Sequence, residues 1–117
     1  MFIYHITSQP LWEEQQPTGF YTPFGYANDG FIHCSTVSQV HPVSLRFYLG
    51  QKDLIVLEID PSRYGALLAF ENLEGGMELF PHLYAPLETE SVHQIYELPL
   101  GVNGDFIFPE LFRQPQG

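Results

Sequence analysis

The sequence predicts a small α+β domain with a largely β core. Residues 54–59 form a nearly unbroken apolar run of strand length, and residues 92–98 alternate apolar with polar side chains. Residues 36–48 carry apolar side chains at helical spacing. Ten Phe and seven Tyr add the aromatic side chains that strands favour. A chain of 117 residues builds one ordinary core, so we expect one domain.

The first twenty residues predict a buried strand followed by a short helix. Residues 2–6 are rich in apolar side chains. Thr7 or Ser8 can cap the helix, and Pro10 falls in its first turn, where a missing N–H is tolerated. Trp12 is then expected to face inward. Residues 20–30 mix aromatic side chains with Pro, Gly, Asn and Asp, which is typical of a long binding loop. Its rings are expected to cover a ligand: Tyr21, Phe24 and Tyr26.

The second predicted helix follows the short apolar run at residues 31–32. Ser35 or Thr36 serves as its N-cap, and Gln39 completes an approximate capping box. Pro42 interrupts the helical pattern, so the helix either kinks or restarts there.

Further strands are expected in the second half of the chain. Residues 66–71 predict a strand and residues 72–76 a flexible turn or loop. Residues 80–87 contain Pro81 and Pro86, which restrict this segment to a broken or edge strand. Residues 92–98 predict the last strand.

We expect a domain over residues 1–100 and a Pro- and Gly-rich tail over residues 101–117. The tail carries Phe106, Phe108 and Phe112. Large rings left in water forgo about 1.5–3 kcal/mol each. We therefore expect the tail to dock on the body or on a neighbouring copy, the latter giving a homodimer.

Composition excludes several classes of function. Four Lys and Arg against fourteen Asp and Glu give a formal net charge of −10, so DNA is not an expected partner. No stretch approaches the roughly 20 apolar residues of a membrane span. The single Cys34 rules out an internal disulfide framework, and we expect a cytoplasmic protein without a membrane partner.

Three segments each place a histidine at the edge of an apolar run, beside a hydroxyl group. They are Tyr4 to Ser8, Gly30 to Ser35 and Phe80 to Tyr84. In an extended strand His33 and Ser35 share a face, whereas Cys34 points to the other side and is expected to be a small core residue. Polar groups at a strand end beside a helix start are typical of ligand sites. Taken alone, the sequence around His33 is equally consistent with a structural role, in which a buried imidazole forms a hydrogen bond with a backbone carbonyl.

Other site chemistries lack support. Three His residues suit catalytic zinc, but no pair has a local ligand spacing, so we expect a metal-free protein. The nucleophile-elbow motif Gly-x-Ser-x-Gly is absent, and the pair Gly75-Gly76 lacks the spacing and the Lys of a phosphate loop. Most acidic residues are expected on a solvated surface. Glu71 is the exception, because it ends a strand just before the glycine turn.

The chain resembles the DUF952 family, a domain of unknown function, from about Ile3 to Leu100. The specific pair of motifs is Gly-Phe-Ile-His-x-Ser and Phe-Pro-His-Leu-Tyr, in that order. The residues that carry the resemblance are Tyr4-His5-Ile6, Trp12, Asp29 to Ser35, Gln39-Val40, Asp53-Leu54, Ile59-Asp60, Glu71 and Phe80 to Leu87. The resemblance implies a split, bent, mainly antiparallel β structure with two or three short helices, like that of the ADP-ribosyltransferases.

The resemblance also implies site roles. His5 would grip a ribose, His33 and Ser35 would line the nicotinamide end, and His82 with Tyr84 would form the third motif. Transferases of this type commonly have Glu at the third motif, where this chain has His82. Many relatives also have Arg before the two glycines, where this chain has Glu74.

The leading hypothesis is a His-lined cleft for a small-molecule ligand containing a nucleotide or ribose, such as NAD or ADP-ribose. If the protein is an enzyme, it would act as a transferase or hydrolase on a glycosidic or phosphoester bond of such a molecule. The candidate catalytic residues are His33 and His82, one or the other giving acid/base or electrostatic help. His5, Ser35, Thr36, Tyr84 and Glu71 would bind the ligand. The second hypothesis is a non-catalytic module that binds a ligand or a protein through the aromatic loop and the tail.

Overall fold

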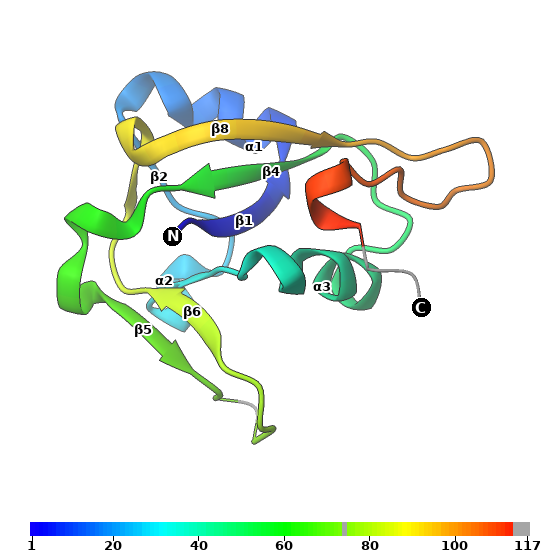
Figure 1. Cartoon of the computed structure of the whole chain (residues 1–117). Coiled ribbons are helices and arrows are strands. Elements are labelled where there is room, and N and C mark those ends of the chain that lie inside the picture. Colours follow the sequence, from blue (N-terminus) through cyan, green and yellow to red (C-terminus); the bar gives the residue numbers. More distant parts are fainter. Residues whose placement is uncertain (74, 114–117) are drawn as a thin grey trace.

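The fold is built on two three-stranded antiparallel sheets, seen in a computed structural model that describes residues 1–73 and 75–113. The first sheet has the order β1-β4-β8, formed by Ile3–Ser8, Leu54–Ile59 and Val92–Leu98. The second has the order β3-β6-β5, formed by Ile32–His33, Phe80–Leu83 and Leu68–Glu71. A two-stranded ribbon joins β2 (Phe20–Tyr21) to β7 (Leu87–Glu88). The hairpin of β5 and β6 projects from the body (Figure 1).

Three short helices accompany the sheets: α1 (Gln9–Gln15), α2 (Tyr26–Asp29) and α3 (Val40–Phe47). Turns of 3₁₀-helix occupy Gln16–Thr18, Val37–Gln39, Pro61–Arg63, Gly65–Leu67, Thr89–Ser91 and Glu110–Phe112. The predicted α+β class, with small antiparallel sheets and short helices, is confirmed.

The two sheets meet at a single backbone bridge between Tyr4 of β1 and Ser35. The Tyr4 amide donates to the Ser35 carbonyl at 2.8 Å, and the Ser35 amide donates to the Tyr4 carbonyl at 2.7 Å. Ser35 follows directly on β3, so this bridge ties the edge of the first sheet to the second.

Local capping explains where the helices begin. The Ser8 hydroxyl accepts from the Leu11 amide at 3.3 Å and caps α1. Thr36 and Gln39 form the predicted capping box, which opens a 3₁₀ turn before α3. Pro42 therefore lies in the first turn of α3, where its missing N–H has no intrahelical partner. Of the two alternatives for Pro42, the helix restarts at Val40.

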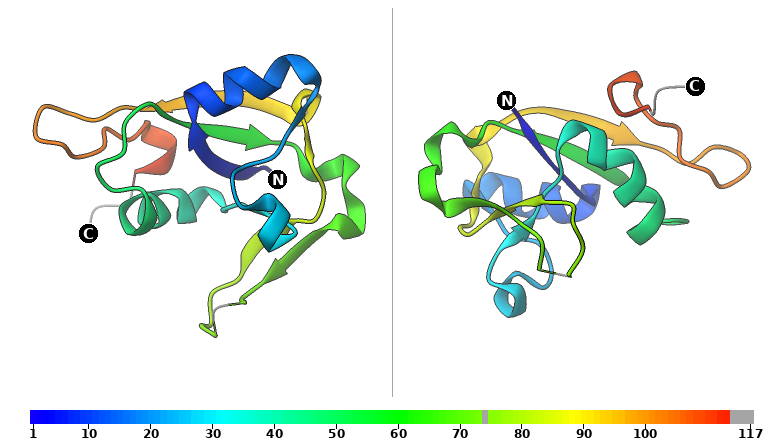
Figure 2. Two further views of the ribbon diagram at one scale, coloured as in Figure 1. Left: turned by 180° about the vertical axis from the view of Figure 1, so that it is seen from behind. Right: turned by 60° about the horizontal axis from the view of Figure 1, so that its bottom comes forward.

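The first sheet separates two apolar clusters because its side chains alternate between faces. Ile55, Leu57 and Ile59 of β4 point to the cluster that contains Trp12 of α1. Leu54 and Val56 point to the cluster that also holds the start of α3 and the C-terminal segment. Figure 2 shows α1 and α3 on opposite sides of this sheet. All six residues of β4 are buried, which accounts for its nearly continuous apolar sequence.

The predicted long loop over residues 20–30 is wrong, because it contains β2 and α2. Tyr21 is buried in the core and does not cover a ligand, and Tyr26 packs against the same cluster. Phe24 is 87% exposed. The Pro, Gly, Asn and Asp residues of this segment end two short elements, and they do not form one continuous loop.

Of the two alternatives predicted for residues 80–87, the broken strand is confirmed, because the segment forms β6 and β7. The other alternative, an edge strand, does not hold for β6, which lies at the centre of its sheet. Pro81 is tolerated there because it lies opposite Cys34, just beyond the end of β3, where the N–H that it lacks is not needed for the β3–β6 ladder. Its carbonyl still accepts a hydrogen bond from the Cys34 amide at 3.0 Å.

The C-terminal segment packs on the first sheet. Phe106 and Phe112 are 7% and 2% exposed. Phe112 makes edge-to-face contacts with Tyr4 and Tyr96, with 5.2 Å between ring centroids in each pair. Phe108 is half-buried, and its ring stacks on the His41 ring with 4.1 Å between ring centroids. Residues 114–117 of the predicted tail lie outside the described residues.

Replacing Phe112 with Ala should lower the free energy of unfolding by about 3–5 kcal/mol, because it removes a fully buried ring between two others. Urea denaturation measures the change. The matched control is Leu111→Ala, since Leu111 is half exposed in the same turn. Equal effects of the two substitutions would contradict the packing described here.

Candidate functional site

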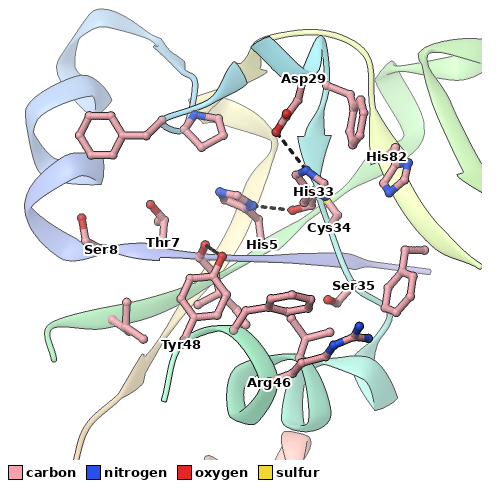
Figure 3. Close-up of a pocket in the computed structure, with 18 of the residues that line it drawn as sticks. His5, Thr7, Ser8, Asp29, His33, Cys34, Ser35, Arg46, Tyr48 and His82 are labelled. Atoms are coloured by element: carbon pink, nitrogen blue, oxygen red, sulfur yellow. Dashed lines mark hydrogen bonds and ion pairs between the residues drawn. The ribbon is translucent and has the colours of Figure 1, made fainter. Parts of the chain in front are cut away.

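A cavity of about 610 Å³ lies between β1, α3 and the sheet of β3, β6 and β5 (Figure 3). Its wall includes His5, His33, Ser35 and His82. The prediction that these four side chains line one cleft is therefore confirmed. Their roles toward a ligand are a separate matter, taken up below.

Strand register explains why residues far apart in sequence meet. His33 of β3 pairs with His82 of β6, and His82 pairs with Ala69 of β5. Glu71 lies two residues beyond Ala69 and so shares its face of the sheet. Ser35 likewise shares a face with His33. One face of this sheet therefore gathers the polar side chains of three strands.

His5 is held by two hydrogen bonds, one on each ring nitrogen. Nδ1 lies 2.7 Å from the His33 carbonyl oxygen, and Nε2 lies 2.8 Å from the Tyr21 hydroxyl. A carbonyl only accepts, so Nδ1 carries the proton. The Tyr21 hydroxyl also lies 2.7 Å from Thr7 Oγ1. His5 thus fixes the end of β3 to β1 and leaves no ring nitrogen for a ligand.

The charge state of His5 agrees with this bonding. Burial lowers its pKa to about 4, and the bond to the His33 carbonyl offsets only part of the effect. His5 is therefore neutral at physiological pH. The implied role of His5, to grip a ribose, does not fit surroundings in which both ring nitrogens are already bonded.

His82 is oriented by a carboxylate. Its Nδ1 lies 3.0 Å from Glu71 Oε1, and its side chain is 7% exposed. The Tyr84 hydroxyl donates to the same oxygen. Hydrogen bonds from Tyr84 and then from His82 lower the pKa of Glu71, so the carboxylate is ionised at neutral pH and accepts a hydrogen bond from the Nδ1–H group of His82. The bond to Glu71 in turn raises the pKa of Tyr84.

His33 is paired with a second carboxylate. Its Nε2 lies 3.1 Å from Asp29 Oδ2, at the end of α2, and its side chain is 60% exposed. The Phe31 ring stacks on the His82 ring with 4.3 Å between ring centroids, and it packs against the His33 ring with 4.7 Å between centroids. The two imidazole rings lie 5.5 Å apart. Two histidines, each bonded to its own carboxylate, thus lie against one aromatic ring.

Ser35 contributes its side chain and not its backbone. Its amide donates to the Tyr4 carbonyl at 2.7 Å, and the Thr36 amide donates to Gln39 Oε1 at 3.0 Å. These two amides are therefore already bonded within the protein. Among the described residues, no hydrogen bond is made by Ser35 Oγ, which faces the cavity (Figure 3).

Not every predicted site residue lines the cavity. Glu71 does, but Thr36 and Tyr84 do not. Thr36 serves the capping box, and Tyr84 acts through Glu71. Cys34 lies in the core cluster of Trp12, as predicted, and burial raises its thiol pKa to about 12. Glu74 lies outside the described residues.

The sequence prediction missed three residues of the wall. Asp29 lies four residues before His33, a spacing at which opposite charges often meet. Phe31 was assigned only to a buried strand, although it also stacks on His82. Arg46 of α3 brings one of the four cationic side chains of the chain to the cavity. The rest of the wall is largely apolar: Leu11, Pro23, Phe24, Val43, Phe47, Leu54, Leu73 and Phe80.

Residues 1–73 and 75–113 contain neither a metal-binding cluster nor a membrane-spanning helix. No group of three His, Cys, Asp or Glu side chains in this range is placed to hold a metal ion. No helix in the same range has the length and apolar character needed to cross a bilayer.

The sequence profile of a family described as "Protein of unknown function (DUF952)" matches residues 6–95, which is most of the chain. The chain belongs to this family. The match includes His33 and His82 with both of their carboxylate partners, and it begins one residue after His5. No curated protein matches the chain.

Solved structures of a relative share the fold. The crystal structure of protein CC0527 from Caulobacter crescentus is 30% identical, with a TM-score of 0.81, over 92% of this chain and 94% of that chain. The solution NMR structure of CC0527 is 32% identical, with a TM-score of 0.77, over 88% and 89% of the two chains. The DUF952 fold therefore extends over nearly the whole length of both proteins.

The buried neutral His5 predicts acid sensitivity. Between pH 6.5 and 4 the unfolded chain binds a proton at His5 and the folded chain does not, so stability should fall as the pH falls through this window. Each pH unit weakens folding by about 1.4 kcal/mol, giving a loss of about 3 kcal/mol. Urea denaturation at several pH values measures it.

His5→Gln should reduce this pH dependence, whereas the control His93→Gln should leave it in place. An unchanged slope between pH 6.5 and 4 in the His5→Gln protein would show that His5 is not the group responsible.

Proposed function

We propose that this DUF952 protein binds a nucleotide or another ribose-containing small molecule, of the NAD or ADP-ribose kind, in the cavity. The observation that carries the proposal is the meeting of His33, His82, Ser35 and Arg46 on one largely apolar wall. Such a ligand combines a flat ring, hydroxyl groups and an anionic link, and the wall offers a partner for each.

Size supports the proposal. Small-molecule sites occupy about 300–1,000 Å³ and combine apolar walls with a few converging polar groups, and this cavity has about 610 Å³. Phe24 and Phe47 are both exposed and lie on the wall, where they are available to stack against a ring. The Ser35 hydroxyl can exchange hydrogen bonds with a ribose hydroxyl.

Charge restricts how an anion would be held. The net charge of −10 repels an anionic ligand at long range, and Asp29 and Glu71 lie on the wall. Arg46 supplies a local positive charge there. The anionic ligand would therefore be attracted only at short range, through Arg46, the imidazoles and Ser35. A nucleic-acid-binding protein uses a basic surface patch for this purpose.

A second candidate is a non-catalytic module that binds a protein. It is favoured by Phe24, which is 87% exposed beside the cavity. The C-terminal rings do not add to that surface, since Phe106 and Phe112 are buried. His82 at the position where related transferases commonly have Glu also favours a binding role over transferase chemistry.

Isothermal titration with NAD, ADP-ribose and AMP tests the proposal. We expect at least one to bind, and Ser35→Ala and Arg46→Gln each to weaken binding by roughly 3- to 10-fold, the effect of one lost hydrogen bond. The control is His93→Gln, because His93 lies outside this cavity. Absence of binding by all three at millimolar concentration would leave the protein-binding module as the better hypothesis.

Salt dependence separates this site from a basic one. Raising salt screens the repulsion from the net charge of −10, so affinity for the anionic ligand should stay constant or rise slightly. Titrations at low and at physiological ionic strength measure it. A marked loss of affinity with salt would mean that attraction by cationic side chains dominates, against this prediction.

A further inference from the structure

The two histidine–carboxylate pairs of the cavity differ in which ring nitrogen they leave open. Glu71 accepts from Nδ1 of His82, which leaves Nε2 of that ring. Asp29 pairs with Nε2 of His33, which leaves Nδ1. No described residue forms a hydrogen bond with either remaining nitrogen. Both rings line the same cavity with their centroids 5.5 Å apart.

We infer that the cavity is a hydrolytic site for a phosphorus–oxygen link of its ligand, with His82 as the general base and His33 as the general acid. This inference rests on the proposed function, since it assigns chemistry to the same ligand. Glu71 and Asp29 are positioning residues, because each acts through the imidazole that it holds.

The roles follow from the surroundings of each ring. Glu71 fixes the Nδ1–H tautomer of His82, so its Nε2 carries the lone pair that a base needs. His82 is also packed under Phe31 and cannot turn freely. His33 is 60% exposed, so its ring is open to water, and its Nε2 lies 3.1 Å from Asp29 Oδ2. In the general-acid role His33 acts as the imidazolium, which carries a proton on Nδ1 as well as on the Nε2 that faces Asp29.

The reaction balances with water as the co-reactant. His82 Nε2 takes a proton from water as the water oxygen forms a bond to phosphorus. The phosphorus–oxygen bond to the leaving group breaks, and the Nδ1 proton of His33 passes to the leaving oxygen. Arg46 supplies positive charge to the phosphoryl oxygens. Proton exchange with solvent then restores both rings.

A glycosidic bond fits the wall less well. Glycoside hydrolysis uses two carboxyl groups, one as acid and the other as base or nucleophile. The two carboxylates of this wall are both bonded to imidazoles, and Glu71 also to Tyr84. The groups left for acid/base work are imidazoles, which suit phosphoryl transfer from a nucleotide.

Hydrolysis is tested with NAD, ADP-ribose, 2′,3′-cyclic AMP and bis(p-nitrophenyl) phosphate. We expect turnover of at least one, with His82→Gln and His33→Gln each lowering kcat by roughly 100-fold or more. The matched control is His93→Gln, since His93 also bonds a carboxylate, Glu58, at 2.8 Å but lies outside the cavity. Ligand binding without turnover of any probe overturns the inference and leaves the proposed function intact.

The pH–rate profile and the ring tautomer test the roles. We expect a bell-shaped profile that loses one limb in each histidine variant. The titratable and charged groups that bear on the two rings are Glu71, Tyr84, Asp29 and His5, and Arg46 lies on the same cavity wall. Nitrogen-15 NMR of the intact protein should show His82 protonated at Nδ1 and unprotonated at Nε2 at neutral pH.

Glu71→Gln should yield a mixture of His82 tautomers and a shifted profile, which a merely structural role would not produce. An Nε2-protonated His82 in the unaltered protein, or a Glu71→Gln protein with an unchanged tautomer and profile, would overturn the assignment of base and positioning residue.

Discussion

The reciprocal hydrogen bonds between Tyr4 and Ser35 are the constraint on which the rest of the site depends. They are the point where the edge of the first sheet meets the end of β3. The neighbouring hydrogen bond from His5 Nδ1 to the His33 carbonyl, at 2.7 Å, is part-buried and reinforces the same junction. Because this junction is fixed, the sheets open a cavity between them instead of packing face to face.

The junction also divides the histidines into two kinds. His5 belongs to the framework, since both its nitrogens are used and burial keeps its pKa low. His33 and His82 stand beyond the junction, where each has one nitrogen bonded to a carboxylate. Similar sequence contexts, a histidine at the edge of an apolar run, thus serve two different purposes.

Much of the fold could be predicted from local patterns. The strands at residues 54–59 and 92–98 and the capping box of Thr36 appear where their sequences place them. The central position of β6 could not be predicted, because it depends on Pro81 lying opposite Cys34, at a strand end far away in the sequence. Likewise the local sequence around Tyr21 is typical of a loop, and its long-range contacts with His5, Trp12 and the core cluster place it in the core.

A histidine–carboxylate pair is not by itself a site, as His93 and Glu58 show. Glu58 is buried and accepts hydrogen bonds from His93, Tyr4 and Tyr96, at 2.8, 2.9 and 3.2 Å. Three donors satisfy the carboxylate and tie three strands together, which is a structural use. Glu71 differs because the ring that it holds lines a cavity beside a second imidazole and an arginine. The surroundings of the pair, more than the pair itself, give His82 its capacity for chemistry.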